Sequence, residues 1–297
     1  MKKQQNEKPE IITKEEKQTR ALLPLTSDIV FKRVFSREGN ERILKSLLEA
    51  ILDTEIQKVE VKNPQLPPNL NDSKAGILDI KVQIDDNTIC DVEMQVRDEK
   101  NIADRSTYYM AKMLSDELKR SEKYIKVKKA IVINILMFNY YKRNSYHSIA
   151  HMKFEDTKRD EYVNLGYADE EKIATKDLEM HFIEIPKFIK KNPEVKTKLE
   201  QWLWAISGKG DKAKMAEEEN KEVKEAMNIV KEMSMSDEEW ELYESRRLAL
   251  LDYNTGIINA KNEERTEIAK QLLKMGMTVK QIKEATNLSE EEIKKIK

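Results

Sequence analysis

The sequence is poor in the residues that mark disulfide-stabilised or loop-rich proteins. Its single cysteine, Cys90, cannot form an internal disulfide, and the 297 residues include only seven glycines and seven prolines. So little glycine and proline favours a helix-rich fold over a loop-rich all-β fold. A lone cysteine is typical of proteins from reducing compartments.

Long apolar segments are also missing. The longest apolar run, residues 130–138, is interrupted by Asn134 and falls short of the roughly 18 residues that a membrane-spanning helix needs. Residues 1–20 are almost wholly polar and contain no apolar segment of a signal peptide. We therefore expect a solvated tail over 1–20 and a soluble, cytoplasmic protein with no membrane partner.

Neither sign of charge is in excess. Lys and Arg total 54 against 55 Asp and Glu, which gives a formal net charge of −1. This balance excludes the broad positive field of a protein that coats nucleic acid, so a DNA partner would have to meet a local basic surface. With 39% hydrophobic residues, the chain still has enough apolar side chains for a core.

The order of hydrophobic patterns predicts an α/β domain followed by helices. Apolar residues recur at helical spacing in 41–52, and alternation predicts two strands joined by a turn over 77–96. A helix over 102–120 and a continuous apolar strand after it imply a parallel crossover, and another strand is expected at 178–185. We expect a mixed sheet with flanking helices over 21–191 and an all-helical region over 192–297.

The two strands of the hairpin carry carboxylates on their polar faces. Matching the apolar faces places Asp79 on the same side as Glu93, and a three-residue turn at 85–87 would put these two residues directly opposite. Polar residues on the outer, solvated face of a hairpin are ordinary, so this spacing matches many unrelated chains. The alternative is a site that needs two acids together.

Two adjacent carboxylates repel unless a cation neutralises them. Mg²⁺ is the natural candidate, because it prefers oxygen ligands and leaves positions for water and substrate phosphate. Gln95 lies two residues beyond Glu93 and projects from the same face. Such a group suits phosphodiester hydrolysis, with the amide orienting the attacking water.

Several short motifs, in order, resemble one nuclease group. The chain is similar to the Rpn recombination-promoting nucleases, also described as PD-(D/E)xK family transposases, over roughly residues 22–188. The motifs that carry the resemblance are T-S-D-I-V-F-K-R-V-F (26–35), L-L-E-A-I-L (47–52), K-A-G-I-L-D-I (74–80), V-E-M-Q (92–95), R-S-T-Y-Y (105–109) and H-F-I-E-I-P-K-F (181–188).

The resemblance implies a PD-(D/E)xK fold and a metal-dependent DNA endonuclease, linked to recombination or mobile elements. It implies that Asp79, Glu93 and the backbone carbonyl of Met94 bind the catalytic Mg²⁺, for which Mn²⁺ could substitute. Gln95 stands where the wider superfamily has lysine, and glutamine cannot supply that positive charge. The alternative is a DNA-binding or assembly module that keeps the fold and has little or no activity.

Six further residues are candidates with ordinary alternatives. Lys81 shares the polar face and could replace the missing lysine. Asp28 belongs to the opening motif and could lie near the site, but an acid at this point also favours the start of a helix. Lys32 and Arg105 could contact DNA phosphates, although lone cations on helices are usually solvated. His147 and His151 have the i, i+4 spacing of a helical metal clamp, without a third ligand in view.

The C-terminal helices have the spacing of a helix-turn-helix. Ile282, Ala285, Leu288 and Ile293 are the expected small core. The would-be recognition helix begins Ser-Glu-Glu-Glu, which is unfavourable for approaching a phosphate backbone. This segment therefore favours an interaction or dimerisation element, and a homo-oligomer formed through it.

Overall fold

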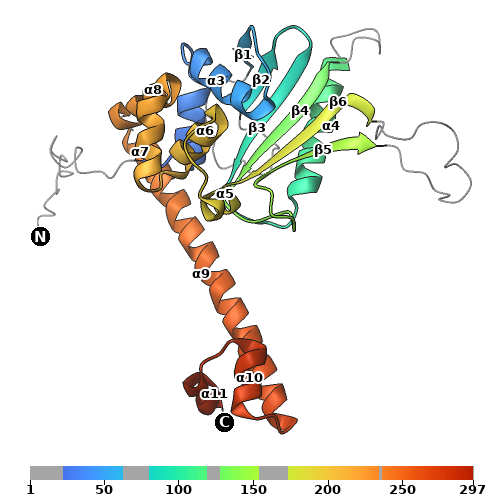
Figure 1. Ribbon diagram of the computed structural model, residues 1–297, viewed down its shortest axis with the longest axis vertical. Helices are drawn as coiled ribbons and strands as arrows, with labels where there is room; N and C mark the ends of the chain where they lie inside the picture. Colours follow the sequence, from blue (N-terminus) through green and yellow to red (C-terminus); the bar gives the residue numbers. More distant parts are fainter. Residues whose placement is uncertain (1–22, 63–79, 119–127, 154–172, 234–235, 297) are drawn as a thin grey trace, which may run out of the picture. The chain divides into compact units, whose positions relative to one another are not determined.

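The computed structural model describes residues 23–62, 80–118, 128–153, 173–233 and 236–296. The chain divides into two compact units, one ending at Ser234 and the other beginning at Met235. The first unit contains a mixed sheet with helices on both of its faces (Figure 1).

Six strands form one sheet in the order β1-β2-β3-β4-β6-β5. Parallel pairs join β3 to β4 and β4 to β6, and the remaining neighbours are antiparallel. The strands are β1 (Val59–Val61), β2 (Ile80–Ile84), β3 (Thr88–Gln95), β4 (Lys129–Leu136), β5 (His147–Lys153) and β6 (Ile173–Glu184). The predicted mixed sheet is confirmed, and at its centre β3, the second strand of the hairpin, pairs in parallel with β4.

Helix α4 (Ile102–Leu118) makes the predicted crossover between the parallel strands β3 and β4. Its Tyr109 and Met113 are buried against Ile89 and Val132. Strand β4 is apolar apart from Lys129 and Asn134, and all but its first residue are buried, as expected of a strand covered on both faces. Helix α4 therefore covers one face of the sheet beside the hairpin.

Two N-terminal helices lie on the other face. Helix α2 (Asp28–Phe35) contacts β3, and α3 (Glu41–Leu52) contacts β1. Figure 1 shows α3 and α6 on one side of the sheet and α4 on the other. The bounds of α3 are those predicted from its apolar spacing, because every core position at that spacing is buried.

The helices that follow the sheet are α5 (Ile185–Lys191), α6 (Lys198–Ser207), α7 (Gly210–Glu219) and α8 (Lys221–Glu232). The charged segment 208–227 contributes to two helices, and Asn220 caps α8 by accepting from the backbone nitrogens of Glu222 and Val223. Helix α8 also packs on α2 and α3, so it contributes to the first unit. The Trp202 side chain of α6 is fully buried and lies 5.5 Å, ring to ring, from Phe35.

The second unit consists of α9 (Asp237–Lys274), α10 (Val279–Thr286) and α11 (Glu290–Ile296). Helix α9 runs without a break through Gly256, since an interior glycine costs only about 1 kcal/mol. None of the described helices is long and apolar enough to cross a membrane.

The core of the second unit differs from the predicted one at a single position. Ile282, Leu288 and Ile293 are buried as expected, together with Ala269 of α9. The expectation for Ala285 is wrong, because this residue is exposed and the neighbouring Thr286 is buried instead. The turn of α10 points residue 286 inward, where its hydroxyl donates to the backbone carbonyl of Ile282 (2.7 Å).

Candidate active site around Glu93

The hairpin has the three-residue turn expected from its alternation. Ile84 pairs with Thr88, so residues 85–87 form the turn, and Asp85 adopts a positive φ of 46°. The Asp85 carboxylate anchors the turn by accepting from the backbone nitrogens of Gln57 (3.0 Å) and Lys58 (2.7 Å). The described pairing of the two strands begins at Ile80. Asp79 lies outside the described residues, so its position opposite Glu93 stays a prediction.

The polar face of β3 is buried, so the alternative of an ordinary solvated outer face does not apply to its acids. Asp91 is 0% exposed and Glu93 is 1% exposed. Both project toward α4, which covers this face as the crossover between β3 and β4. Burying carboxylates costs free energy unless they are paired and hydrogen-bonded, so a function or a compensating network is needed here.

That network converges on one oxygen of Glu93. Gln95 Nε2 donates to Glu93 Oε2 at 2.8 Å, and Arg105 Nη2 donates to the same oxygen at 3.0 Å. The Arg105 side chain is 30% exposed, so it extends from the buried carboxylate to solvent. An ion pair between Glu93 and Arg105 therefore compensates the burial of this carboxylate.

Tyr109 holds Arg105 from one turn further along α4. Arg105 Nε donates to the Tyr109 hydroxyl at 3.1 Å, and the guanidinium carbon lies 5.4 Å from the centre of the tyrosine ring. Burial, with the nearby Glu93 charge adding to it, raises the pKa of Tyr109 to about 12. Tyr109 therefore stays a neutral phenol that orients the guanidinium.

Asn134 completes the buried polar group and was not predicted as a site residue. It pairs with Glu93 across the parallel β3–β4 ladder. Its Oδ1 accepts from the Ser106 hydroxyl (3.0 Å), and its Nδ2 donates to the carbonyl of His181 (3.2 Å). Its one signal in the sequence is that it is the single polar residue of the apolar run 130–138.

Asp91 and Lys81 occupy the next position along the same face. They are directly opposite on β3 and β2. Lys81 Nζ lies 3.7 Å from Asp116 Oδ2 of α4. Lys81 therefore neutralises the acidic end of α4 near Asp91, while Arg105 is the cation at Glu93.

The other predicted accessory residues belong to α2. Asp28 is the first residue of this helix, and its Oδ1 accepts from the backbone nitrogen of Ile29 at 2.9 Å. Lys32 is only 7% exposed and so is not a solvated surface cation. A catalytic or DNA-contacting role for either residue stays a prediction.

Glu184 ends β6 on the same face of the sheet. Through the register of β4 it lies in one row with Gln95, two strands away. It is fully buried, accepts from the backbone nitrogen of Tyr140 (2.6 Å) and pairs with Lys187 (2.7 Å). These contacts bind the segment after β4 to the start of α5 at the same edge as the Glu93 group.

The oxygen ligands at this site are chemically suited to a hard divalent cation, although the described residues supply only some of the expected ligands. Glu93, the Gln95 amide and the Met94 carbonyl are oxygen donors of the kind that Mg²⁺ prefers. Within the described ranges, no group of three or more His, Cys, Asp or Glu side chains comes together to hold a metal ion. The expected second carboxylate, Asp79, is outside those ranges.

His147 and His151 do not have the helical spacing of a metal clamp, because both lie on strand β5. His147 Nε2 instead lies 3.0 Å from His181 Nδ1 of β6. Burial lowers the pKa of His181 to about 4 and also lowers the pKa of His147. His181 pairs with Ile133, whereas Asn134 is next to Glu93, so the histidine pair lies on the opposite face of the sheet.

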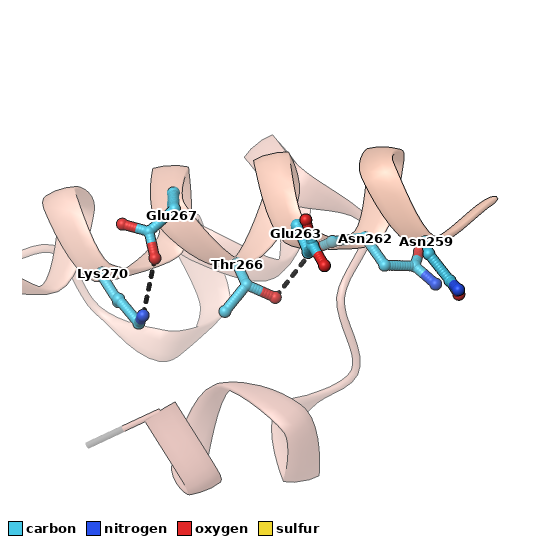
Figure 2. Close-up of a pocket in the computed structure, with 6 residues that line it drawn as sticks. All are labelled: Asn259, Asn262, Glu263, Thr266, Glu267 and Lys270. Carbon is cyan, nitrogen blue, oxygen red and sulfur yellow. Dashed lines mark hydrogen bonds and ion pairs between the residues drawn. The ribbon is translucent and has the colours of Figure 1, made fainter. Parts of the chain in front are cut away.

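A separate polar pocket lies on α9 in the second unit. Figure 2 shows its lining side chains along one side of this helix: Asn259, Asn262, Glu263, Thr266, Glu267 and Lys270. Lys270 pairs with Glu267 (2.6 Å), and the Thr266 hydroxyl donates to the Asn262 carbonyl (2.8 Å). The pocket contains none of the predicted site residues.

The fold and the site together define the class. A mixed sheet whose acidic hairpin leads through a helix into a parallel strand, with E-x-Q at the end of the second hairpin strand, has the arrangement of PD-(D/E)XK nucleases. Residues 25–261 match the family described as PD-(D/E)XK nuclease family transposase, and the chain belongs to this family. Residues 262–297 match the Rpn/YhgA-like nuclease family, C-terminal HTH domain.

These matches confirm the resemblance seen in the short motifs. They also show that the C-terminal segment belongs to a helix-turn-helix family, and the two families together imply a DNA partner. No curated protein and no solved structure matched the chain in the same comparisons.

Proposed function

We propose that this protein is a metal-dependent DNA endonuclease that hydrolyses phosphodiester bonds. The observation that carries the proposal is the buried Glu93 carboxylate, held by Gln95 and Arg105 at the E-x-Q position of a PD-(D/E)XK family member. Burying a carboxylate only to stabilise the sheet would cost free energy without need, because apolar residues stabilise a buried position as well.

Glu93, Asp79 and the Met94 carbonyl would hold the metal, Mg²⁺ or Mn²⁺ in its place. When bound, the metal supplies Lewis-acid polarisation of the scissile phosphate and a lower pKa for the attacking water. Gln95 is half-buried, so its amide reaches the solvent side of the site and can orient that water. We propose that this reaction takes place on cytoplasmic DNA, where it promotes recombination or the movement of mobile elements.

The first test is cleavage of supercoiled plasmid by the full chain with Mg²⁺, with Mn²⁺ and with EDTA. Glu93→Gln and Asp79→Asn should each lower the cleavage rate by about 100-fold or more, as expected when a group that acts in the transition state is lost. Glu60→Gln is the matched control, because Glu60 is a 50% exposed carboxylate on β1 of the same sheet. Cleavage that survives EDTA, or that survives both site substitutions, would refute the proposal.

A second candidate function is a DNA-binding or assembly module with little or no activity. Gln95 in the place of the superfamily's lysine favours it, because glutamine carries no charge to stabilise a developing oxyanion. For such a module, a gel-shift assay should show DNA binding that Glu93→Gln leaves unchanged, with no metal-dependent cutting by the wild type. The same plasmid and the same variants therefore separate the two functions.

The C-terminal helices are the proposed route to a homo-oligomer. Leu248, Leu251 and Ile258 of α9 are 51%, 49% and 58% exposed and recur at spacings of three and seven residues along the helix. A second copy of α9 offers the same apolar stripe, as an isologous dimer requires. Light scattering should show a dimer for the wild type, and Leu251→Glu combined with Ile258→Glu should yield a folded monomer. A wild-type monomer at high concentration would contradict this arrangement.

A further inference from the structure

We propose that Arg105 is the cationic group of this active site, in place of the lysine that Gln95 replaces. It holds the Glu93 carboxylate before DNA binds and contacts the scissile phosphate in the DNA complex. This inference rests on the proposed nuclease function and names a catalytic residue within it.

The convergence on Glu93 is the first argument. The amide of Gln95 and the guanidinium of Arg105 both donate to Glu93 Oε2, at 2.8 Å and 3.0 Å. The charge absent from residue 95 is therefore present at the same carboxylate oxygen, although it comes from α4 and not from β3. A neutral amide and a neighbouring guanidinium together provide what one lysine side chain would provide.

The reach of Arg105 is the second argument. Its side chain is 30% exposed, whereas that of Glu93 is 1% exposed, so the guanidinium spans from the buried acid to the solvent side where DNA must arrive. A guanidinium has five N–H donors in a planar fork. It can therefore donate to a carboxylate oxygen and to a phosphate oxygen at the same time. The compact ammonium group of lysine is less suited to such paired contacts.

The orientation of Arg105 is the third argument. Tyr109 accepts from Arg105 Nε at 3.1 Å, one helical turn along α4. This contact uses the inner edge of the guanidinium and directs its remaining nitrogens toward Glu93. An arginine that served only as a surface charge for DNA binding would not need a buried tyrosine to hold it.

Other described cations on this face have different partners. Lys81 Nζ is 3.7 Å from Asp116. Lys128 Nζ is 2.6 Å from Gln83 Oε1 and 3.1 Å from Glu117, at the opposite end of the strands. Of these three cations, Arg105 is the one that contacts the E-x-Q motif.

The test uses the full chain with three substitutions on α4. Arg105→Gln removes the charge and keeps hydrogen-bonding capacity, and Arg105→Lys restores the charge. Lys112→Gln is the matched control, because it removes one positive charge from the same side of the helix, seven residues further on, at an exposed position. Plasmid cleavage at saturating Mn²⁺ measures activity, and Mn²⁺ titration followed by electron paramagnetic resonance without DNA measures metal affinity.

Arg105→Gln should lower the cleavage rate at saturating Mn²⁺ by about 100-fold, because a donor that acts on the transition state is lost. It should at the same time tighten Mn²⁺ binding by about 3-fold or more, because a cation that competes for Glu93 is gone. Arg105→Lys should recover activity to within about 10-fold of the wild type, and Lys112→Gln should change both quantities less than about 2-fold.

Three results would overturn the inference. If Arg105→Gln cleaves the plasmid at the wild-type rate at saturating metal, the role of Arg105 is refuted and the nuclease proposal stands. Loss of Mn²⁺ binding in Arg105→Gln would show a structural role for the ion pair. If neither the wild type nor Glu93→Gln cuts the plasmid, the nuclease proposal is refuted, and this inference is refuted with it.

If Arg105→Gln does not fold, Tyr109→Phe and Arg105→Lys test the proposal in its place. Tyr109→Phe keeps the ring and removes only the hydroxyl that orients the guanidinium. It should lower the cleavage rate several-fold without changing the unfolding midpoint of the Mn²⁺-free protein by more than about 2 °C, since one partly exposed hydrogen bond contributes little to stability. An unchanged cleavage rate in Tyr109→Phe would contradict the proposal, and so would loss of cleavage in a folded Arg105→Lys variant.

Discussion

Acidification from pH 7 to pH 4 should destabilise the first unit through His181. This side chain is 2% exposed, on β6, with its Nδ1 3.0 Å from His147 Nε2 and its Nε2 3.6 Å from Glu179 Oε2. Burial lowers the pKa of His181 from 6.5 to about 4, with the His147 charge adding to the shift and Glu179 opposing it. The folded protein therefore favours the neutral imidazole.

The sign and the size follow from proton linkage. Well above pH 6.5 the imidazole is neutral in both states, so its burial carries no penalty from titration. As the pH falls below 6.5 the unfolded chain takes up a proton that the folded chain refuses, so stability declines until the folded pKa near 4 is reached. A shift of about 2.5 pKa units at 1.36 kcal/mol each corresponds to a loss of about 3 kcal/mol.

The assay is urea unfolding between pH 7 and pH 4, followed by tryptophan fluorescence. A Trp240→Phe background confines the signal to Trp202 and Trp204 of the first unit. The wild type should lose about 3 kcal/mol more than His181→Gln over this interval, since other titrating groups are common to both proteins. Equal losses in the two proteins would refute the reasoning, because the pH dependence would then belong to groups other than His181.

Three further substitutions test the packing that supports the sites. Trp202→Ala should destabilise the first unit by about 3–5 kcal/mol in urea unfolding, because it removes a fully buried ring that packs on Phe35; a cost below about 1 kcal/mol would show that α6 is not part of this core. Ser106→Ala should cost about 1–2 kcal/mol in the same assay, since it removes the hydroxyl that donates to the buried Asn134, and an unchanged stability would mean that water replaces this bond. Ile282→Ala should cost about 2–4 kcal/mol in the second unit alone, as read from hydrogen exchange of α10, and leave exchange in β4 unchanged.

Much of the architecture follows from short-range pattern. The alternation of β2 and β3, the helical spacing of α3 and the apolar run of β4 are local signals, and each element formed where its pattern predicted. The three-residue turn at 85–87 followed from matching the apolar faces of two strands close in the chain. Glu93 and Gln95 could be named from sequence because a period of two places them on one face.

Other features depend on segments that are distant in the chain. The apolar alternation of residues 147–153 is too weak to predict β5, which forms because β6 offers a strand edge some 30 residues later. Helix α9 continues through Gly256 and several asparagines, because a capping box at Ser236 and continuous hydrogen bonding outweigh their low helix propensities.

The sequence by itself determined the hairpin, helix α3 and strand β4, and that Glu93 and Gln95 share a face, since these depend on periodicity over a few residues. Only the tertiary structure decided that this face is buried, because nothing local to the hairpin reveals that α4 will pack across it. The same packing brings Arg105 and Asn134 to Glu93 from elements outside the hairpin. The sequence pattern places the Glu93 carboxylate only on a polar face. In the folded protein this carboxylate is buried and paired, and its chemistry is set by residues of α4 and β4.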